Sequence, residues 1–95
     1  MIVAELSVVP LGEGTSVSKY VKEAVDALKK EGLKLAPGAM GTTVEAKSLD
    51  ELFAATKMAH EAVFKAGARR VVTTLRIDDR RDKESSIESK MKAIR

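Results

Sequence analysis

IVAELSVVP, at residues 2–10, alternates apolar and mixed positions with a period of two. Four apolar side chains fall on one side of an extended chain at this spacing: Ile2, Ala4, Leu6 and Val8. The other side is mixed and carries Glu5 and Ser7. This pattern predicts a strand that buries one face in the core and leaves the other face open.

An amphipathic helix is expected to follow this strand. The turn residues of 11–16 precede it, and Thr15 or Ser16 is expected to cap a helix that begins near Val17. Apolar side chains then recur at helical spacing as far as Leu28, and Gly32 is expected to end the helix.

A hairpin is expected next. Residues 33–36 and 42–46 have the composition of short strands, and the glycine-containing segment 37–41 joins them. The first three residues of the second strand are all β-branched, which favours extended backbone.

A capping box marks the start of the second long helix. Ser48 and Glu51 have the spacing at which each side chain accepts a bond from the other's backbone N–H, and the helix is expected to run to about Ala66. After Gly67, residues 70–78 alternate again and predict a fourth strand, followed by a charged linker at 79–83.

The C-terminal tail reads as a short helix. Ser85 and Glu88 match a second capping box, and Ile87, Met91 and Ile94 form one apolar edge. Because so short a helix is marginal alone in water, this edge is expected to dock on another surface.

The order β-α-β-β-α-β predicts an α+β fold of the ferredoxin-like kind, a sandwich with a four-stranded antiparallel sheet and an added C-terminal helix. Ninety-five residues fit one domain, with a core at 1–79 and a helical extension at 83–95. Both long helices should cover one sheet face and leave the other face open.

Polar side chains gather on that open face. Strand parity places Glu5 and Ser7 there with Thr43, Glu45 and Arg76, so two carboxylates and a guanidinium fall on adjacent strands. One interpretation is a cross-strand salt bridge, such as a pair of Glu45 with Arg76, that fixes strand register. The other is a net acidic binding site for a cationic or amine-bearing ligand.

Composition narrows the function further. The net charge of +3 comes from interleaved signs, and all three aromatic side chains lie on predicted helices, so a nucleic-acid platform of stacked bases is disfavoured. There is no cysteine, no apolar run of membrane-spanning length and no signal-peptide pattern, which favours a cytoplasmic protein without a membrane partner. No nucleophile or metal site accompanies the carboxylates, and the single histidine, His60, has the setting of a hydrogen-bonded core residue, so no enzyme is expected.

Four segments together resemble the thiamine-binding protein family: ELSVVPLG at 5–12, SVSKYV at 16–21, MGTTVE at 40–45 and RIDDR at 76–80. The resemblance covers nearly the whole chain. It implies a ferredoxin-like fold, assembly into homodimers or homotetramers, and binding of thiamine or its hydroxymethylpyrimidine part without a catalytic residue set or a cofactor. Carried over by motif, Ser7, Thr42 and Glu45 lie at the ligand.

The candidate ligand-binding residues are therefore those from strand parity and those from the resemblance: Glu5, Ser7, Thr42, Thr43, Glu45 and Arg76. Two other function classes stay open at this point. One is a regulatory module that senses an amino acid or another metabolite, and the other is a purely structural assembly protein.

Overall fold

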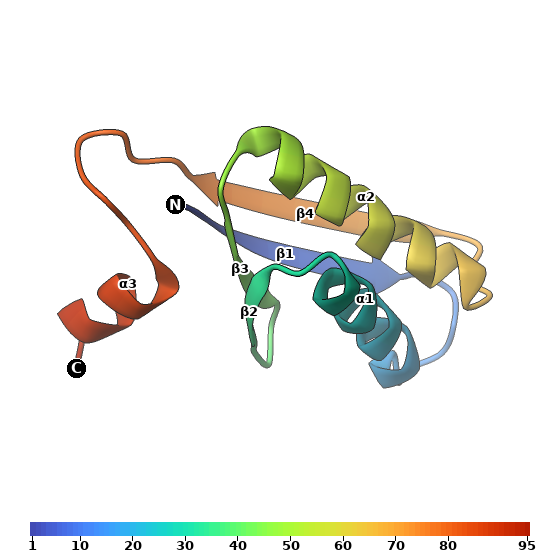
Figure 1. The fold of residues 1–95 in the computed structure, drawn as a ribbon. Helices are drawn as coiled ribbons and strands as arrows, with labels where there is room; N and C mark the ends of the chain where they lie inside the picture. The colour runs from blue at the N-terminus through green and yellow to red at the C-terminus, as the bar shows by residue number, and fades with distance from the viewer.

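The computed structural model describes residues 1–95 and confirms the ferredoxin-like order with one added helix (Figure 1). Its elements are β1 (Ile2–Pro10), α1 (Ser18–Lys30), β2 (Lys34–Pro37), β3 (Thr42–Ala46), α2 (Leu49–Lys65), β4 (Val71–Asp78) and α3 (Ile87–Ala93). All neighbouring strands are antiparallel, and their order across the sheet is β2-β3-β1-β4. None of the helices is long and apolar enough to cross a membrane.

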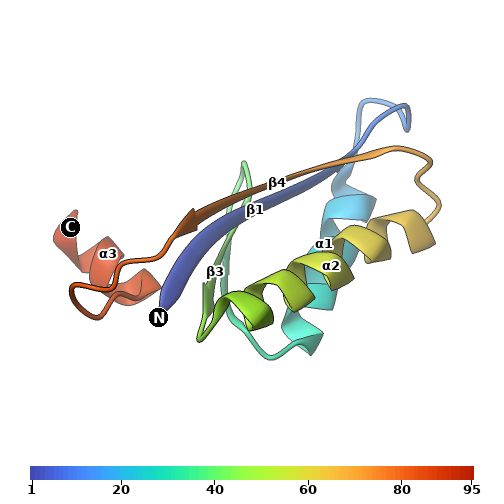
Figure 2. The same ribbon diagram turned by 90° about the horizontal axis from the view of Figure 1, so that it is seen from above.

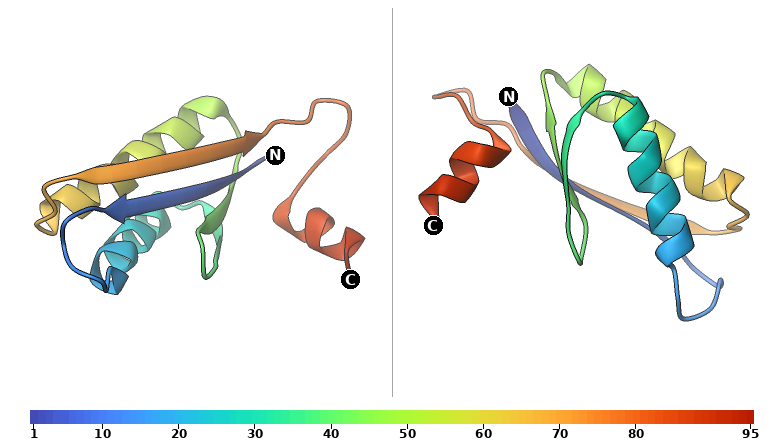
Figure 3. Two further views of the ribbon diagram at one scale, coloured as in Figure 1. Left: turned by 180° about the vertical axis from the view of Figure 1, so that it is seen from behind. Right: turned by 60° about the horizontal axis from the view of Figure 1, so that its bottom comes forward.

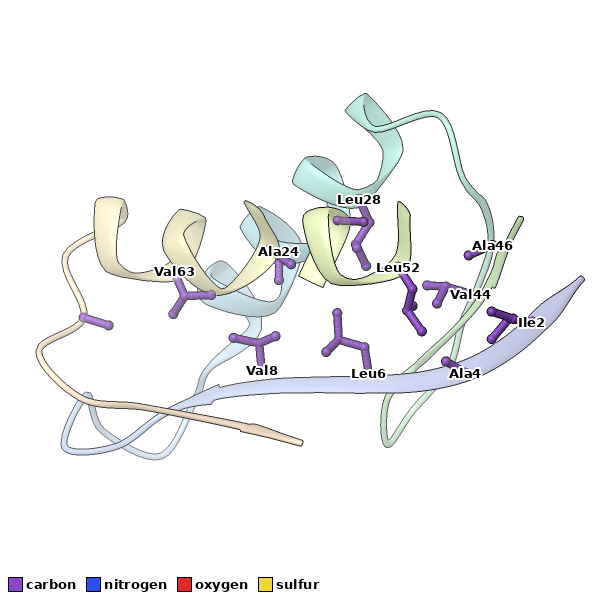
Figure 4. Packing of buried hydrophobic residues seen from close by; sticks show 13 residues of the cluster. Ile2, Ala4, Leu6, Val8, Ala24, Leu28, Val44, Ala46, Leu52 and Val63 are labelled. Carbon is purple, nitrogen blue, oxygen red and sulfur yellow. The ribbon is translucent and has the colours of Figure 1, made fainter. Parts of the chain in front are cut away.

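The core lies between the sheet and the two long helices, which cover the same sheet face (Figure 2). The apolar side of β1 points into it as the alternation predicts, and Leu6 meets Leu28 from α1 and Leu52 from α2 (Figure 4). Burying one such side chain contributes about 1.5 to 3 kcal/mol, so the alternation of β1 fixes which way the sheet faces.

The start of α2 largely follows the prediction, whereas that of α1 does not. The Glu51 N–H donates to Ser48 Oγ at 3.1 Å, but the Glu51 carboxylate accepts from the Lys47 N–H instead of that of Ser48. The N-cap of α1 is Val17, which has no capping side chain, so the expected cap by Thr15 or Ser16 is wrong.

Glycines end both long helices as predicted. Gly32 and Gly67 follow the last turns with φ of +77° and +113°, a region that residues with a Cβ rarely adopt.

Helix α3 lies away from α1 and α2, at the far end of a long open linker (Figure 3). Its capping box is shifted by one residue from the prediction: Ser86 is the N-cap and exchanges hydrogen bonds with Ser89, each at 2.9 Å. None of the seven residues of α3 is buried, and Met91 and Ile94 stay largely exposed. The apolar edge predicted for this helix is therefore unpartnered within one chain.

Removal of residues 83–95 is expected to leave a cooperative fold. The core cluster contains no residue beyond Ala68, and α3 is held to the open face by the hydrogen bond from the Ile87 N–H to Glu45. We expect the free energy of unfolding to fall by about 1 to 3 kcal/mol, the value of one partly buried side chain and its contacts. Urea unfolding of both chains measures this, and loss of the cooperative transition would place α3 in the core.

Candidate functional site

Glu5 is the centre of the open face. It lies directly opposite Thr43 on β3 and directly opposite Arg76 on β4. The next row along β1 pairs Ser7 with Thr74. Strand pairing therefore brings four of the six candidate residues onto one exposed surface, because successive side chains alternate between the two faces.

A hollow of about 240 Å³ surrounds Glu5 on this face. Its polar lining has two carboxylates and two cations, Glu5 and Asp78 with Arg76 and Lys90. Asp78 and Lys90 form a salt bridge, whereas no ion pair joins Glu5 to Arg76. The Glu5 carboxylate and the Arg76 guanidinium are thus both free to bind a ligand at this place.

Glu45 lies on the same face of the sheet, but its side chain is buried. Its neighbours across the sheet are Val3 and Lys34, and only 8% of the residue is exposed. The Ile87 N–H, at the first turn of α3, donates to Glu45 Oε1 at 2.7 Å. A carboxylate at a helix N-terminus satisfies a backbone donor that the helix itself leaves free. Glu45 therefore holds α3 against the sheet.

The sequence-based pairing of Glu45 with Arg76 is wrong. Arg76 lies opposite Glu5, whereas Glu45 lies opposite Val3, one row further along β1. Strand β1 separates the two side chains, so register cannot be fixed by a direct contact between them.

Thr42 lies on the other face of the sheet. It is paired with Leu6, points toward the helices and is 6% exposed. It lines a second hollow of about 260 Å³, whose wall is mainly apolar and which also includes Ser7. The six candidate residues are consequently divided between two hollows and the α3 contact.

This second hollow exists because β1 is longer than β3. Strand β3 pairs only with residues 2–6 of β1, so residues 7–10 have a strand neighbour on one side only. The Leu11 N–H donates to Arg70 O, so the backbone groups of Leu11 point toward the β4 side. Because this direction alternates from residue to residue along a strand, Val8 turns its N–H and C=O toward the opposite side, where β3 does not reach. The sequence pattern of residues 2–10 is longer than that of residues 42–46, and this difference could have predicted the apolar hollow, which the sequence analysis missed.

Gly41 lets the hairpin approach β1 closely. A Cβ built at Gly41 would lie 3.3 Å from Glu5 Cγ and 3.3 Å from Leu6 O, which is tighter than ordinary contacts. This position lines the apolar hollow and touches the Glu5 side chain, so it stands between the two hollows.

A third hollow, of about 400 Å³, lies where α2 begins and β4 ends. Its charged linker residues are already paired, Arg80 with Asp82 and Arg81 with Asp79. The hydrogen bond from Arg80 lowers the pKa of Asp82 to about 2, and the bond from Arg81 lowers the pKa of Asp79. The two arginines and two aspartates of this hollow therefore pair with one another.

His60 is hydrogen-bonded within the chain. Its Nδ1 lies 2.6 Å from Thr73 Oγ1, and its ring packs edge-on against Phe64 with centroids 5.3 Å apart. No group of three or more His, Cys, Asp or Glu side chains is arranged to hold a metal ion.

The ferredoxin-like fold thus presents a polar open face with a hollow around Glu5, and a second, mainly apolar hollow on the other face of the sheet. The chain belongs to the thiamine-binding protein family, whose model matches residues 4–95.

Curated relatives and solved structures agree with this membership. A UPF0045 protein of Methanothermobacter thermautotrophicus is 52% identical over 96 residues, which cover 100% of this chain and 97% of the relative. The crystal structure of the hypothetical protein MJ1052 of Methanocaldococcus jannaschii has a TM-score of 0.91 at 53% identity, with 98% of this chain and 94% of that chain covered.

A third structure adds a functional context. It is that of a Thermotoga maritima protein provisionally assigned to thiamine biosynthesis or salvage, with a TM-score of 0.85 at 26% identity over 99% of this chain and 98% of that one.

Proposed function

We propose that this protein binds thiamine or its hydroxymethylpyrimidine part, without catalysing a reaction, as a homo-oligomer. The observation that carries the proposal is the match of residues 4–95 to the thiamine-binding family. The unpaired Glu5 carboxylate on the open face supports it.

The chemistry of the Glu5 hollow suits this ligand. Thiamine has a cationic thiazolium ring and an exocyclic amine on its pyrimidine. Glu5 offers a negative charge and hydrogen-bond acceptors, and Thr43 adds a hydroxyl beside it. Arg76 lies directly opposite Glu5 and adds hydrogen-bond donors to the same hollow. In this proposal Glu5, Thr43 and Arg76 contact the ligand, and Ser7 extends the same surface.

Glu45 and Thr42 have different parts in the proposal. Glu45 acts through α3, because its carboxylate holds the N-terminus of that helix beside Lys90, which lines the Glu5 hollow. Thr42 belongs to the apolar hollow on the opposite face, where a ring without charge is better accommodated.

A thermal-shift series tests the function. We expect thiamine or hydroxymethylpyrimidine to raise the melting temperature, and at 100 times the dissociation constant the gain is about 2.7 kcal/mol, or about 10 °C or more for a chain of this size. The control ligands are amino acids. Stabilisation by an amino acid alone would indicate a metabolite-sensing module. If neither thiamine, hydroxymethylpyrimidine nor an amino acid raised the melting temperature, the result would favour a purely structural assembly role.

A further inference from the structure

Helix α3 lies at the end of the sheet where β1 begins and β4 ends (Figure 2). Two polar contacts join it to the open face. The Ile87 N–H donates to Glu45 on β3, and the Lys90 ammonium pairs with Asp78 on β4. Glu45 and Asp78 both lie opposite Val3, one on each side of β1. Helix α3 therefore bridges β3 and β4 across the first strand.

This attachment is weak enough to be reversible. None of the seven residues of α3 is buried, and a helix of this length is marginal on its own in water. The side chains of Lys90 and Asp78 are 41% and 53% exposed, and exposed ion pairs contribute little. The hydrogen bond from Ile87 to the buried Glu45 carboxylate is therefore the main polar link between α3 and the sheet. Segments with so few buried contacts open locally while the core stays folded.

Lys90 is the one residue of α3 that lines the Glu5 hollow, and all the other lining residues are on β1, β3 and β4. With α3 in place, the carboxylates of Glu5 and Asp78 face the cations of Arg76 and Lys90, so the formal charges of the hollow cancel. Release of α3 removes Lys90 and frees Asp78 from its salt bridge. The hollow then has two carboxylates against one guanidinium and becomes net acidic.

We propose that α3 is an internal competitor for cationic ligands: the Lys90 ammonium takes the place of a ligand's cation in the Glu5 hollow, and a cationic ligand binds there by displacing the helix. This displacement rests on the proposed site at Glu5 and regulates it. The Lys90 ammonium repels a second cation in the same hollow and engages the Asp78 carboxylate that the ligand would otherwise reach. A ligand that binds only the helix-free form has an apparent affinity reduced by the fraction of chains in that form.

The sheet offers Glu45 a second partner when α3 leaves. Lys34 on β2 lies directly opposite Glu45 and forms no salt bridge while α3 is docked. Side chains directly opposite on neighbouring strands are close enough to interact. On displacement, Glu45 exchanges the Ile87 N–H for the Lys34 ammonium, so the cost of leaving a carboxylate without a partner is avoided. Helix α3 is thus an element with two arrangements, and a ligand shifts the balance between them.

Two substitutions of Ile87 separate the docked and displaced arrangements. Ile87→Pro removes the N–H that Glu45 accepts. The helix itself tolerates this proline, because Ile87 is its first residue and Ser86 before it is extended. Ile87→Val is the matched control and keeps the N–H. A fluorophore on Ile94→Cys reports docking by its anisotropy, since the chain has no cysteine of its own and Ile94 is 77% exposed. Before any ligand is added, we expect lower anisotropy with Ile87→Pro than with Ile87→Val.

Thiamine is the cationic probe, and hydroxymethylpyrimidine, which lacks the thiazolium, is the control ligand. We expect saturating thiamine to lower the anisotropy of the labelled chain and hydroxymethylpyrimidine to leave it unchanged. By calorimetric titration, Ile87→Pro should bind thiamine at least about tenfold more tightly than the wild type, because the charged hydrogen bond no longer opposes displacement. Lys90→Gln should gain about two- to fivefold. Lys92→Gln removes the same charge from α3 outside the hollow and should bind as wild type.

These measurements distinguish failure of the displacement from failure of the proposed function. Equal anisotropy with Ile87→Pro and Ile87→Val would overturn the displacement without any ligand. Equally tight thiamine binding by the wild type, Ile87→Pro and Lys90→Gln would overturn it too and leave the proposed function standing, as would an equal gain in Lys90→Gln and Lys92→Gln. Binding to Ile87→Pro and Lys90→Gln but not measurably to the wild type would support it. Thiamine binding to none of these chains would overturn both.

Discussion

Replacing Glu5 by lysine is expected to lower the affinity for thiamine at least about a hundredfold. Glu5 is exposed, lies between Thr43 and Arg76, and makes no ion pair within the chain. A hydrogen bond to a charged group contributes about 1.5 to 3 kcal/mol, and reversal of the charge adds repulsion of the thiazolium, so the loss exceeds about 2.7 kcal/mol. Calorimetric titration measures the loss.

Two further variants keep this test specific. Glu5→Gln retains the shape of the side chain and should lose about tenfold, which controls for crowding by lysine. Glu23→Lys makes the same charge reversal on the exposed side of α1 and should bind as wild type. Unchanged affinity in Glu5→Lys with an unchanged thermal melt would exclude the open face as the site. Thr42→Val would then test the apolar hollow.

Leu52→Ala is expected to lower the free energy of unfolding by about 2 to 5 kcal/mol. Leu52 is 1% exposed and belongs to the central core cluster, so its loss leaves a cavity that the packed sheet and helices cannot fill. Guanidinium unfolding measures the change. Met58→Ala is the matched control, because Met58 is on the same helix but 42% exposed, and it should cost less than about 1 kcal/mol. Equal losses in both variants would contradict the described core.

Strand faces were predictable from the sequence because alternation is a local property. The parity of Ile2, Leu6 and Val8 was sufficient to place Glu5 and Arg76 on the open face, which the register confirms. The Ser48 cap was predictable for the same reason, since all its partners lie within four residues.

The features that the sequence did not predict depend on contacts between segments that are distant in the chain. The hydrogen-bond partner of Glu45 is the Ile87 N–H, 42 residues away, and no periodicity in either segment predicts this contact. Phe53 has the spacing of a core residue with His60 and Val63, yet it is half exposed because the sheet ends at β4 and nothing in the chain lies beyond it. Local pattern indicates that a side chain is apolar but not whether the fold supplies a surface for it.

The short reach of β3 along β1 makes the hairpin turn an adjustable part of this fold. A turn with two more residues on each arm would carry β3 alongside Val8, and the chain's own backbone would then occupy the apolar hollow. A shorter turn would widen the same space. Residues 38–41 are outside the core cluster, so we expect the fold to tolerate insertions and deletions there, and each would change the size of the apolar hollow. The size of this hollow is therefore open to change by turn length alone, without any substitution in the residues that hold the domain together.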